Sequence, residues 1–368
     1  MPAFDGIYLD HNATTPAKPG VVEKMLETLA FPGNASAVHR AGRKARLLIE
    51  DSRQTLLRAI NAENRDILVF TSGATEANNL VLQGLSTERV IVSAIEHPSV
   101  LNARSKKDIL PVLSSGTVDL DALENMLSGS MRQTLVSVML VNNETGVIQP
   151  IEDIALLTRK HGCLLHVDAV QAFGRMPVDI QKLKADFLTL SAHKMGGPQG
   201  IGCLVIANCN SLSPVLLGGN QEKNMRAGTE NLAAICGFAK AAELIDISGF
   251  QMLATWRDRI EQRLLSIAPD VRIFGKDVPR VANTSMFSFA GLSSETQLIA
   301  LDLAGICVSN GSACSSGTVK ASHVLKAMGV SESLAQSSLR VSLGWNTTEK
   351  DVDLFIAEWQ KIYQRVKK

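Results

Sequence analysis

The chain has 368 residues, of which 45% are hydrophobic and 20% are charged, a composition typical of a folded enzyme with a large core. Its 37 lysines and arginines nearly balance its 36 aspartates and glutamates, and no basic tract stands out, so we expect no nucleic acid as a direct partner. Residues 1–6 carry no signal-peptide pattern, and no stretch approaches the roughly 18 apolar residues of a membrane span, so we expect a protein that does not cross a membrane. The cysteines are scattered and form no C-x-x-C pair, which favours the cytoplasm.

Apolar, β-branched segments alternate with helical patterns through the first part of the chain. Strands are predicted at residues 67–70, 90–94, 135–141, 163–167, 187–190 and 203–206. Helices are predicted between them at residues 75–84, 99–105, 120–127, 151–161 and 178–183. Such alternation indicates βαβ units and a mainly parallel sheet, and strands this apolar suit a sheet that is covered on both faces.

The pattern changes after residue 236. An amphipathic helix is predicted at residues 232–245, a second helix at 256–267, and strands of a smaller sheet at 271–274, 284–289 and 339–343. The last helix begins at a capping box made by Thr348 and Asp351. Its apolar stripe comprises Val352, Phe355, Ile356, Trp359, Ile362 and Val366. We therefore expect an α/β protein with a large domain at residues 15–255 and a small α/β domain made of residues 1–14 and 256–368.

Five of the predicted strands lead directly into polar segments, at residues 71–76, 96–98, 142–146, 168–171 and 191–194. In an open α/β sheet, ligands bind outside the carboxyl ends of the strands, so we expect these segments to meet in one crevice. Each segment alone would be explained as a loop with capping residues. Five of them with compatible chemistry favour a binding site.

Asp168 follows the predicted strand 163–167, and Lys194 follows the next predicted strand, 187–190. This pair suits pyridoxal phosphate chemistry, in which the lysine amine bonds to the cofactor aldehyde and the aspartate pairs with the protonated pyridine nitrogen. Either residue alone would more often be a surface lysine or a loop cap. The glycine and helix start at residues 72–75 suit a phosphate, although a plain N-cap by Ser72 or Thr75 would have the same pattern.

Three further residues carry candidate chemistry. His97 precedes a proline, and its imidazole could stack on a cofactor ring, although a lone histidine is more often structural. Cys314 lies in the Ser- and Gly-rich segment 309–317, which suits an exposed nucleophile, whereas the other cysteines are expected in the core. Arg340 lies in a half-apolar strand and could bind a substrate carboxylate, or be a surface arginine on an edge strand.

These motifs resemble those of the class I cysteine desulfurases, the nitrogen-fixation and iron–sulfur-cluster-assembly type in the fold-type-I superfamily of pyridoxal-phosphate enzymes. The resemblance extends from residues 8–15 to Arg340 and includes residues 226–231 as well as the segment around Cys314. It implies the fold-type-I architecture and the conversion of L-cysteine to L-alanine. The sulfur would be transferred as a persulfide on Cys314, for iron–sulfur cluster assembly or other sulfur-requiring pathways.

The resemblance also implies roles for individual residues. Lys194, His97 and Cys314 would be catalytic, with Lys194 holding pyridoxal 5′-phosphate and His97 stacking on its ring. The cofactor contacts that it implies are Ala74, Thr75, His97, Asn143, Asp168, Gln171, Ser191, His193 and Lys194, with Thr229 reaching the cofactor of the other subunit in a homodimer. Arg340 and Asn34 would bind the substrate carboxylate, and at Asn34 the chain departs from the family by reading Asn34-Ala35 where Asn-Pro is usual.

A sulfur-acceptor scaffold protein is the further partner that the resemblance implies. No stably bound metal is implied, with Cys314 able to hold an iron–sulfur cluster transiently through its persulfide. Two alternatives remain open: an aminotransferase or selenocysteine lyase on the same scaffold, and a non-catalytic binding protein. An aminotransferase has no use for a cysteine in a flexible loop, and a colourless purified protein would favour the non-catalytic alternative.

Overall fold

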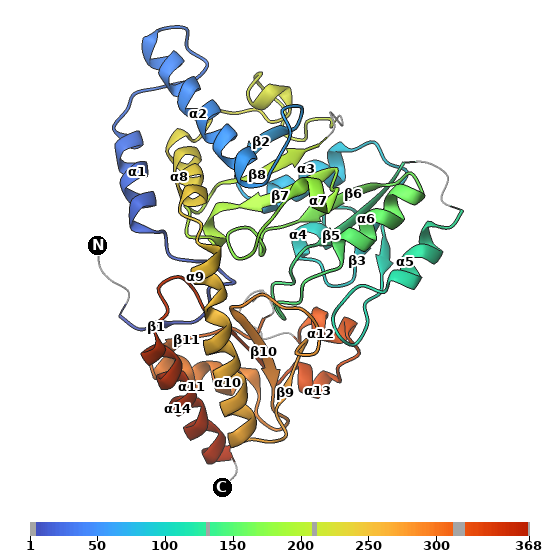
Figure 1. The fold of residues 1–368 in the computed structure, drawn as a ribbon, viewed down its shortest axis with the longest axis vertical. Coiled ribbons are helices and arrows are strands. Elements are labelled where there is room, and N and C mark those ends of the chain that lie inside the picture. The colour runs from blue at the N-terminus through green and yellow to red at the C-terminus, as the bar shows by residue number, and fades with distance from the viewer. Residues whose placement is uncertain (1–4, 130–132, 208–211, 312–320, 367–368) are drawn as a thin grey trace.

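The structure is a computed structural model that describes residues 5–129, 133–207, 212–311 and 321–366. Cys209 and Cys314 lie outside these residues. Figure 1 shows a large sheet surrounded by helices and, below it, a smaller part formed mostly by the C-terminal third of the chain. The described helices include none that is both long and apolar enough to cross a lipid bilayer.

The large sheet has seven strands among the described residues, in the order β2-β8-β7-β6-β5-β3-β4. Their bounds are β2 (Ile67–Thr71), β3 (Arg89–Ser93), β4 (Asp108–Leu110), β5 (Thr134–Met139), β6 (Leu164–Asp168), β7 (Phe187–Ser191) and β8 (Gly202–Ile206). The six strands predicted for this sheet all form, within two residues of their expected ends, and the mainly parallel sheet is confirmed. Only β4 was not predicted.

Strand β8 runs antiparallel to both of its neighbours, β2 and β7. The connection from β7 comprises residues 192–201, which is shorter than the roughly dozen residues that a parallel crossover needs. It begins with the short 3-10 helix η1 (Ala192–Lys194). Gly202 allows β8 to approach the turn before α3, because a Cβ there would lie 2.8 Å from the backbone of Gly73. The sheet therefore reverses direction directly beside Lys194.

Helices cover both faces of the sheet, as the apolar strands predicted. One face packs against α2 (Arg40–Ala59), α6 (Ile151–Lys160), α7 (Ile180–Leu183) and α8 (Leu232–Glu243), with α1 (Pro19–Leu29) and α5 (Leu120–Leu127) outside them. The other face packs against α3 (Ala74–Gly84) and α4 (Pro98–Leu101). Alternate residues of each strand enter the two apolar clusters, as with Leu68 and Val69 in β2.

Three predicted helices differ from the structure. Helix α8 was expected to be amphipathic, but ten of its residues are buried because α1 and α2 pack on the side away from the sheet. The helix expected at residues 99–105 is the short α4, which starts at Pro98 and is capped at Asn102. The helix expected at residues 178–183 is α7, whose start is fixed by Asp179 accepting hydrogen bonds from the backbone of Gln181 and Lys182.

The smaller part contains a three-stranded antiparallel sheet and a two-stranded parallel one. In the first, β10 (Thr284–Ser288) lies between β12 (Ser338–Ser342) and β9 (Arg272–Ile273). In the second, β1 (Ile7–Tyr8) pairs with β11 (Ile306–Cys307), which joins the N-terminal segment to the C-terminal part. The helices of this part are α10 (Leu253–Ile267), α11 (Ser294–Leu303), α12 (His323–Ala327), α13 (Glu332–Ala335) and α14 (Glu349–Val366), with α9 (Ile247–Gln251) leading into them.

The core of the smaller part gathers around α14. The capping box is confirmed, since Thr348 N donates to Asp351 Oδ2 at 2.8 Å and Asp351 N donates to Thr348 Oγ1 at 3.3 Å. Trp359 is fully buried and contacts Phe287 edge-on at a centroid distance of 5.8 Å. Leu9 and Leu253 belong to the same apolar cluster. The domain limits at residues 14–15 and 255–256 stay a proposal.

A buried ion pair holds the segment that follows β8. Arg53 of α2 lies 2.8 Å from Glu222, and the two side chains are 3% and 2% exposed. Glu222 also accepts a hydrogen bond from Phe70 N at 2.8 Å. The short 3-10 helix η2 (Glu222–Asn224) has positive φ angles of 44°, 56° and 64° at its three residues, a conformation that is strained for side chains other than glycine. The ion pair therefore stabilises a strained turn.

We expect Glu222→Gln to lower the free energy of unfolding by about 3 kcal/mol, because it removes the buried counter-ion of Arg53 and leaves only the half-exposed carboxylate of Glu50, 3.2 Å away. Glu349→Gln removes an exposed ion pair with Arg259 and should cost less than about 1 kcal/mol. Urea denaturation of both variants measures the difference. Equal effects of the two substitutions would contradict the importance of the buried pair.

Candidate active site

A cavity of about 880 Å³ lies at the carboxyl ends of the central strands, between the large sheet and the smaller part. All five polar segments that were predicted to converge contribute to its wall. The predicted site residues that line it are Ala74, Thr75, His97, Asn143, Asp168, Gln171, Ser191, His193, Lys194 and Arg340. The structure thus brings these residues together, while the role of each stays a prediction.

Lys194 lies at the end of β7, in η1, with its amine inside the cavity. Its Nζ donates to the carbonyl oxygens of Asn12 at 2.7 Å and Ala13 at 2.6 Å. Burial, followed by repulsion from Arg175 and Arg340, lowers the pKa of Lys194 to about 7. A substantial fraction of this amine is therefore neutral near pH 7, which is the form that attacks an aldehyde.

Asp168 ends β6 and lies on the cavity wall beside Lys194. Its Oδ2 accepts a hydrogen bond from Asn78 Nδ2 at 2.9 Å, and its Oδ1 accepts one from Val170 N at 3.0 Å. Burial raises the pKa of Asp168, and the hydrogen bonds oppose that rise. A carboxylate that is this deeply buried gains most from a cationic partner, which a protonated pyridine nitrogen would supply.

The N-terminus of α3 forms one end of the cavity. Gly73 precedes the helix with φ of 156°, and no atom lies within 4 Å of the position that a Cβ would take. Thr75, Ser191 and His193 line the same cavity. A helix of this length with free N–H groups at its start favours a phosphate. Burial lowers the pKa of His193 to about 4, so its ring meets such a group as a neutral hydrogen-bond partner.

Gln171 and His97 line the same cavity as the N-terminus of α3 and Asp168. The side-chain oxygen of Gln171 is buried and has no hydrogen-bond partner among the described residues, while its nitrogen donates to Asn12 O at 3.0 Å. His97 caps α4, and its Nδ1 accepts a hydrogen bond from Ser99 N at 3.1 Å. An unpaired buried oxygen and a lining imidazole are features of a cavity that binds a polar ligand.

Arg340 brings a positive charge into the cavity from β12. Its guanidinium donates to Asn143 O at 2.9 Å and pairs with Asp10 at 2.6 Å, and its Nε is buried without a partner among the described residues. It is 4% exposed, which excludes the alternative of a surface arginine. The planar fork therefore faces a cavity with donor capacity left for a carboxylate.

Several lining residues were missed in the sequence. Asp10 and Asn12 follow β1, so they repeat the pattern of a strand followed by polar residues, but a two-residue strand gives too short an apolar signal to detect. Asn78, Glu144 and His323 also contact the cavity residues or line the cavity. Glu144 belongs to a predicted polar segment without having been singled out.

Three predicted residues are not placed in the cavity by this single chain. Thr229 and Asn34 are exposed and do not line it, and Asn34 Oδ1 accepts a hydrogen bond from Ser36 N at 2.9 Å. Cys314 lies outside the described residues, as does most of the segment 309–317. Their predicted roles remain predictions.

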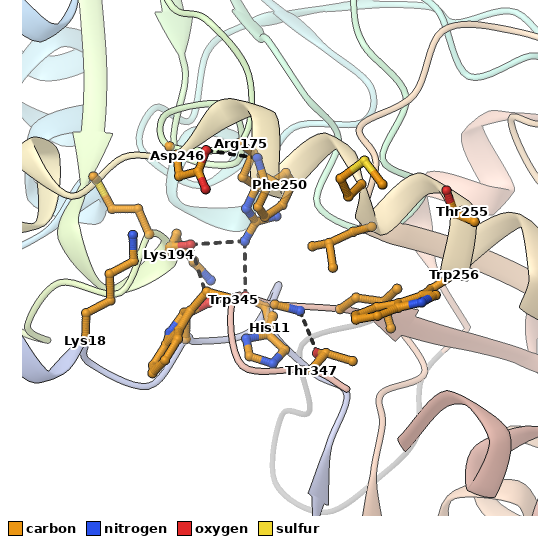
Figure 2. Close-up of a pocket in the computed structure, with 18 residues that line it drawn as sticks. His11, Lys18, Arg175, Lys194, Asp246, Phe250, Thr255, Trp256, Trp345 and Thr347 are labelled. Atoms are coloured by element: carbon orange, nitrogen blue, oxygen red, sulfur yellow. Dashed lines mark hydrogen bonds between the residues drawn. The ribbon is translucent and has the colours of Figure 1, made fainter. Parts of the chain in front are cut away.

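A second cavity of about 340 Å³ lies on the other side of Lys194. Figure 2 shows His11, Arg175 and Lys194 on its wall, together with Trp256 and Trp345. Arg175 donates to the backbone oxygens of His11 at 3.1 Å and Lys194 at 3.3 Å (Figure 2). The backbone of Lys194 is therefore fixed from this side while its amine enters the larger cavity.

Comparisons with known proteins agree with this geometry. Residues 7–355 match the model of the family Aminotransferase class-V. A cysteine desulfurase of Sinorhizobium fredii is 41% identical over 364 residues, covering 94% of each chain, and one of Nostoc sp. is 38% identical over 377 residues, covering 98% of this chain and 94% of the relative. The chain belongs to the cysteine desulfurase family.

Solved structures of relatives have the same fold. The NifS-like protein of Rickettsia africae superposes with a TM-score of 0.91 at 37% identity, covering 98% of this chain and 99% of the other. SspA in complex with cysteine superposes with a TM-score of 0.78 at 30% identity, covering 92% and 98%. The resemblance to the nitrogen-fixation type of cysteine desulfurase and the fold-type-I architecture are thus confirmed.

The lowered pKa of Lys194 predicts a pH dependence for cofactor capture. The cofactor-free enzyme should bond added pyridoxal 5′-phosphate faster as the pH rises through about 7, and the rate should level off above it, because the amine is then neutral. An ordinary lysine would continue to gain reactivity up to about pH 10. Stopped-flow absorbance of the bound cofactor measures the rate, with Lys194→Ala as the variant that forms no bond. A midpoint near that of a free lysine would contradict the burial effect.

Proposed function

We propose that this enzyme removes sulfur from L-cysteine, releasing L-alanine and leaving the sulfur as a persulfide on Cys314. The observation that carries the proposal is the amine of Lys194, with its pKa lowered to about 7, in one cavity with Asp168 and Arg340. The names of full-length relatives, which are cysteine desulfurases, support it, as does the neighbour SspA in complex with cysteine.

The cavity fits pyridoxal 5′-phosphate as the cofactor. Lys194 would hold its aldehyde, Asp168 its pyridine nitrogen, and the start of α3 with Thr75, Ser191 and His193 its phosphate. When bound, the cofactor withdraws electrons from the α-carbon of the amino acid that is attached to it. The unpaired oxygen of Gln171 and the open space at Gly73 are features of this structure that support the fit.

The protein's own groups would divide the remaining tasks. Arg340 binds the substrate carboxylate through its free donor capacity, and Asp10 keeps the guanidinium in place. Lys194 Nζ takes the α-proton and returns it, which a pKa near 7 allows at neutral pH. The thiol of Cys314 supplies the nucleophile that receives the sulfur.

The proposal includes a homodimer in which Thr229 contacts the cofactor of the other subunit, and a sulfur-acceptor scaffold protein as the partner that takes the persulfide sulfur. The exposed position of Thr229 leaves it accessible to a second subunit. Iron–sulfur cluster assembly is the proposed use of the sulfur, supported by the IscS and NifS-like names of relatives. We infer a cytoplasmic location, which suits the free thiols of Cys163, Cys203, Cys236 and Cys307.

Cys314→Ser tests the persulfide. The variant should bind the cofactor and show the spectral change on adding cysteine, but lose persulfide and alanine formation by more than about 1,000-fold, because the nucleophile is absent. Mass spectrometry of the enzyme and an alanine assay measure the two products. Cys236→Ser, which changes a buried cysteine of α8, is the matched control. Alanine formation at the normal rate in Cys314→Ser would exclude the persulfide route.

The shared active site predicts complementation between two inactive variants. Thr229→Asp places a negative charge where the partner's cofactor phosphate would lie, and Lys194→Ala removes the cofactor anchor. Co-expressed and purified as a mixed dimer through two different tags, the pair should regain activity, because one of its two sites has both native residues. A mixed dimer as inactive as its parents would show that Thr229 does not act across the interface.

A further inference from the structure

Asn78 is a buried amide directly behind the wall of the larger cavity. It is 0% exposed and does not itself line the cavity, but the two side chains that its nitrogen contacts both do. Its Nδ2 donates to Asp168 Oδ2 at 2.9 Å and to the Ser99 hydroxyl oxygen at 2.9 Å. Both hydrogens of the amide are therefore used, one for each of these neighbours. The roles proposed above leave this residue unassigned.

The helix that carries Asn78 also forms the proposed phosphate end of the cavity. Asn78 lies four residues after Ala74, the first residue of α3, so the two side chains lie on the same side of the helix, one turn apart. Ala74 lines the cavity at the start of the helix, and Asn78 reaches Asp168 at the end of β6. Helix α3 thus connects the proposed phosphate site with the proposed partner of the ring nitrogen.

The side-chain oxygen of Asn78 indicates that the amide serves as a donor. This Oδ1 is buried and has no hydrogen-bond partner among the described residues. An unpaired buried acceptor is unfavourable, and an apolar side chain at this position would avoid it. Turning the amide over would place Oδ1 against Asp168, and an ionised carboxylate only accepts hydrogen bonds. The amide therefore keeps its nitrogen toward Asp168 while its own oxygen stays unpaired.

Asp168 depends on this donor for its orientation. Its Oδ1 is fixed by the backbone nitrogen of Val170 in the same loop, so Asn78 is the one side chain among the described residues that forms a hydrogen bond with it. Burial raises the pKa of Asp168, and the hydrogen bond from Asn78 opposes that rise more than any other neighbour does. A carboxylate that is ionised and fixed at both oxygens is the form that pairs with a protonated pyridine nitrogen.

We propose that Asn78 is a positioning residue for the cofactor, holding Asp168 in the orientation that pairs with the ring nitrogen. This inference rests on the proposed function, because it takes pyridoxal 5′-phosphate as the cofactor. Asn78 acts through Asp168 and contacts neither the cofactor nor the substrate. Loss of its hydrogen bond should therefore weaken the part of cofactor binding that depends on the ring nitrogen and leave the contacts of the phosphate and the aldehyde.

Asn78→Leu tests the proposal, because leucine has a similar volume but no donor. The full-length, cofactor-free enzyme is titrated with pyridoxal 5′-phosphate and with its 1-deaza analogue, in which a carbon replaces the ring nitrogen. The wild-type enzyme should bind pyridoxal 5′-phosphate more tightly than the analogue. In Asn78→Leu the affinity for pyridoxal 5′-phosphate should fall about 10- to 100-fold, the equivalent of one hydrogen bond to a charged group. The affinity for the analogue should change little.

Ser99→Ala is the matched control, since it removes the other partner of the same amide. The Ser99 hydroxyl lies 2.8 Å from His97 Nδ1, so this variant should affect both compounds alike and keep the preference for the ring nitrogen. The ¹⁵N chemical shift of labelled, bound cofactor gives a second readout. It should report a protonated ring nitrogen in the wild type and in Ser99→Ala, and move toward the value of a neutral pyridine in Asn78→Leu.

Asn78→Ala is the second variant, because alanine cannot clash and is favourable in a helix. It should show the same dependence on the ring nitrogen as Asn78→Leu. An equal loss of affinity for both compounds, no loss for either, or an unchanged ¹⁵N shift would overturn the proposal. Absence of pyridoxal 5′-phosphate binding to the wild-type enzyme would instead overturn the proposed function, so the two failures are distinguishable.

Discussion

The polar junction at Asn12 is the constraint on which the arrangement of the active site depends. It lies between the two apolar cores and is 2% exposed, so each of its polar groups needs a partner. Its backbone oxygen accepts from Lys194 at 2.7 Å and from Gln171 at 3.0 Å, and its side-chain oxygen accepts from Arg175 at 2.6 Å. Its nitrogens donate to Asn143 O, Thr284 Oγ1 and Ser342 Oγ. One residue thus connects η1 after β7, the loops after β5 and β6, and the two long strands of the smaller part.

The residues around Asn12 also explain how Lys194 can be buried with a pKa of about 7. Arg175 and Arg340 lie close enough to lower the pKa of Lys194, and both are themselves held by oxygen atoms of the N-terminal segment that carries Asn12. Burial and repulsion from Arg340 lower the pKa of Arg175 to about 9. The N-terminal segment therefore offsets the cost of collecting three basic groups around one cavity, through neutral carbonyls and a single carboxylate at Asp10. Arg175 is held by neutral acceptors, which leave its charge uncompensated and preserve its repulsion of the lysine amine, whereas Asp10 partly opposes the lowering of the Lys194 pKa.

Most of the sheet and the convergence of its polar segments could be predicted, because long apolar strands followed by polar residues give a strong local signal. The antiparallel direction of β8 could not be predicted from composition, because an apolar strand such as 203–206 has the same composition in either direction. Only the short connection from β7 determines that β8 runs antiparallel. Helix α8 has small and apolar residues on every side, and its burial depends on α1 and α2, which come from far earlier in the chain. The junction at Asn12 depends on hydrogen bonds to residues more than 100 positions away.

The buried carboxyl of Glu96 shows how the site keeps its charges apart. Burial, with a smaller contribution from the nearby Asp168, raises the pKa of Glu96 to about 8, so near neutral pH the group is mostly protonated. Its Oε1 accepts from Ser93 at 2.5 Å and from Met139 N at 2.8 Å, which fixes the chain where β3 ends. The side chain can therefore position the backbone oxygen that binds His323 without adding a negative charge behind the cavity. A neutral Glu96 thus adds no second negative charge next to Asp168, the group proposed to pair with the cofactor ring.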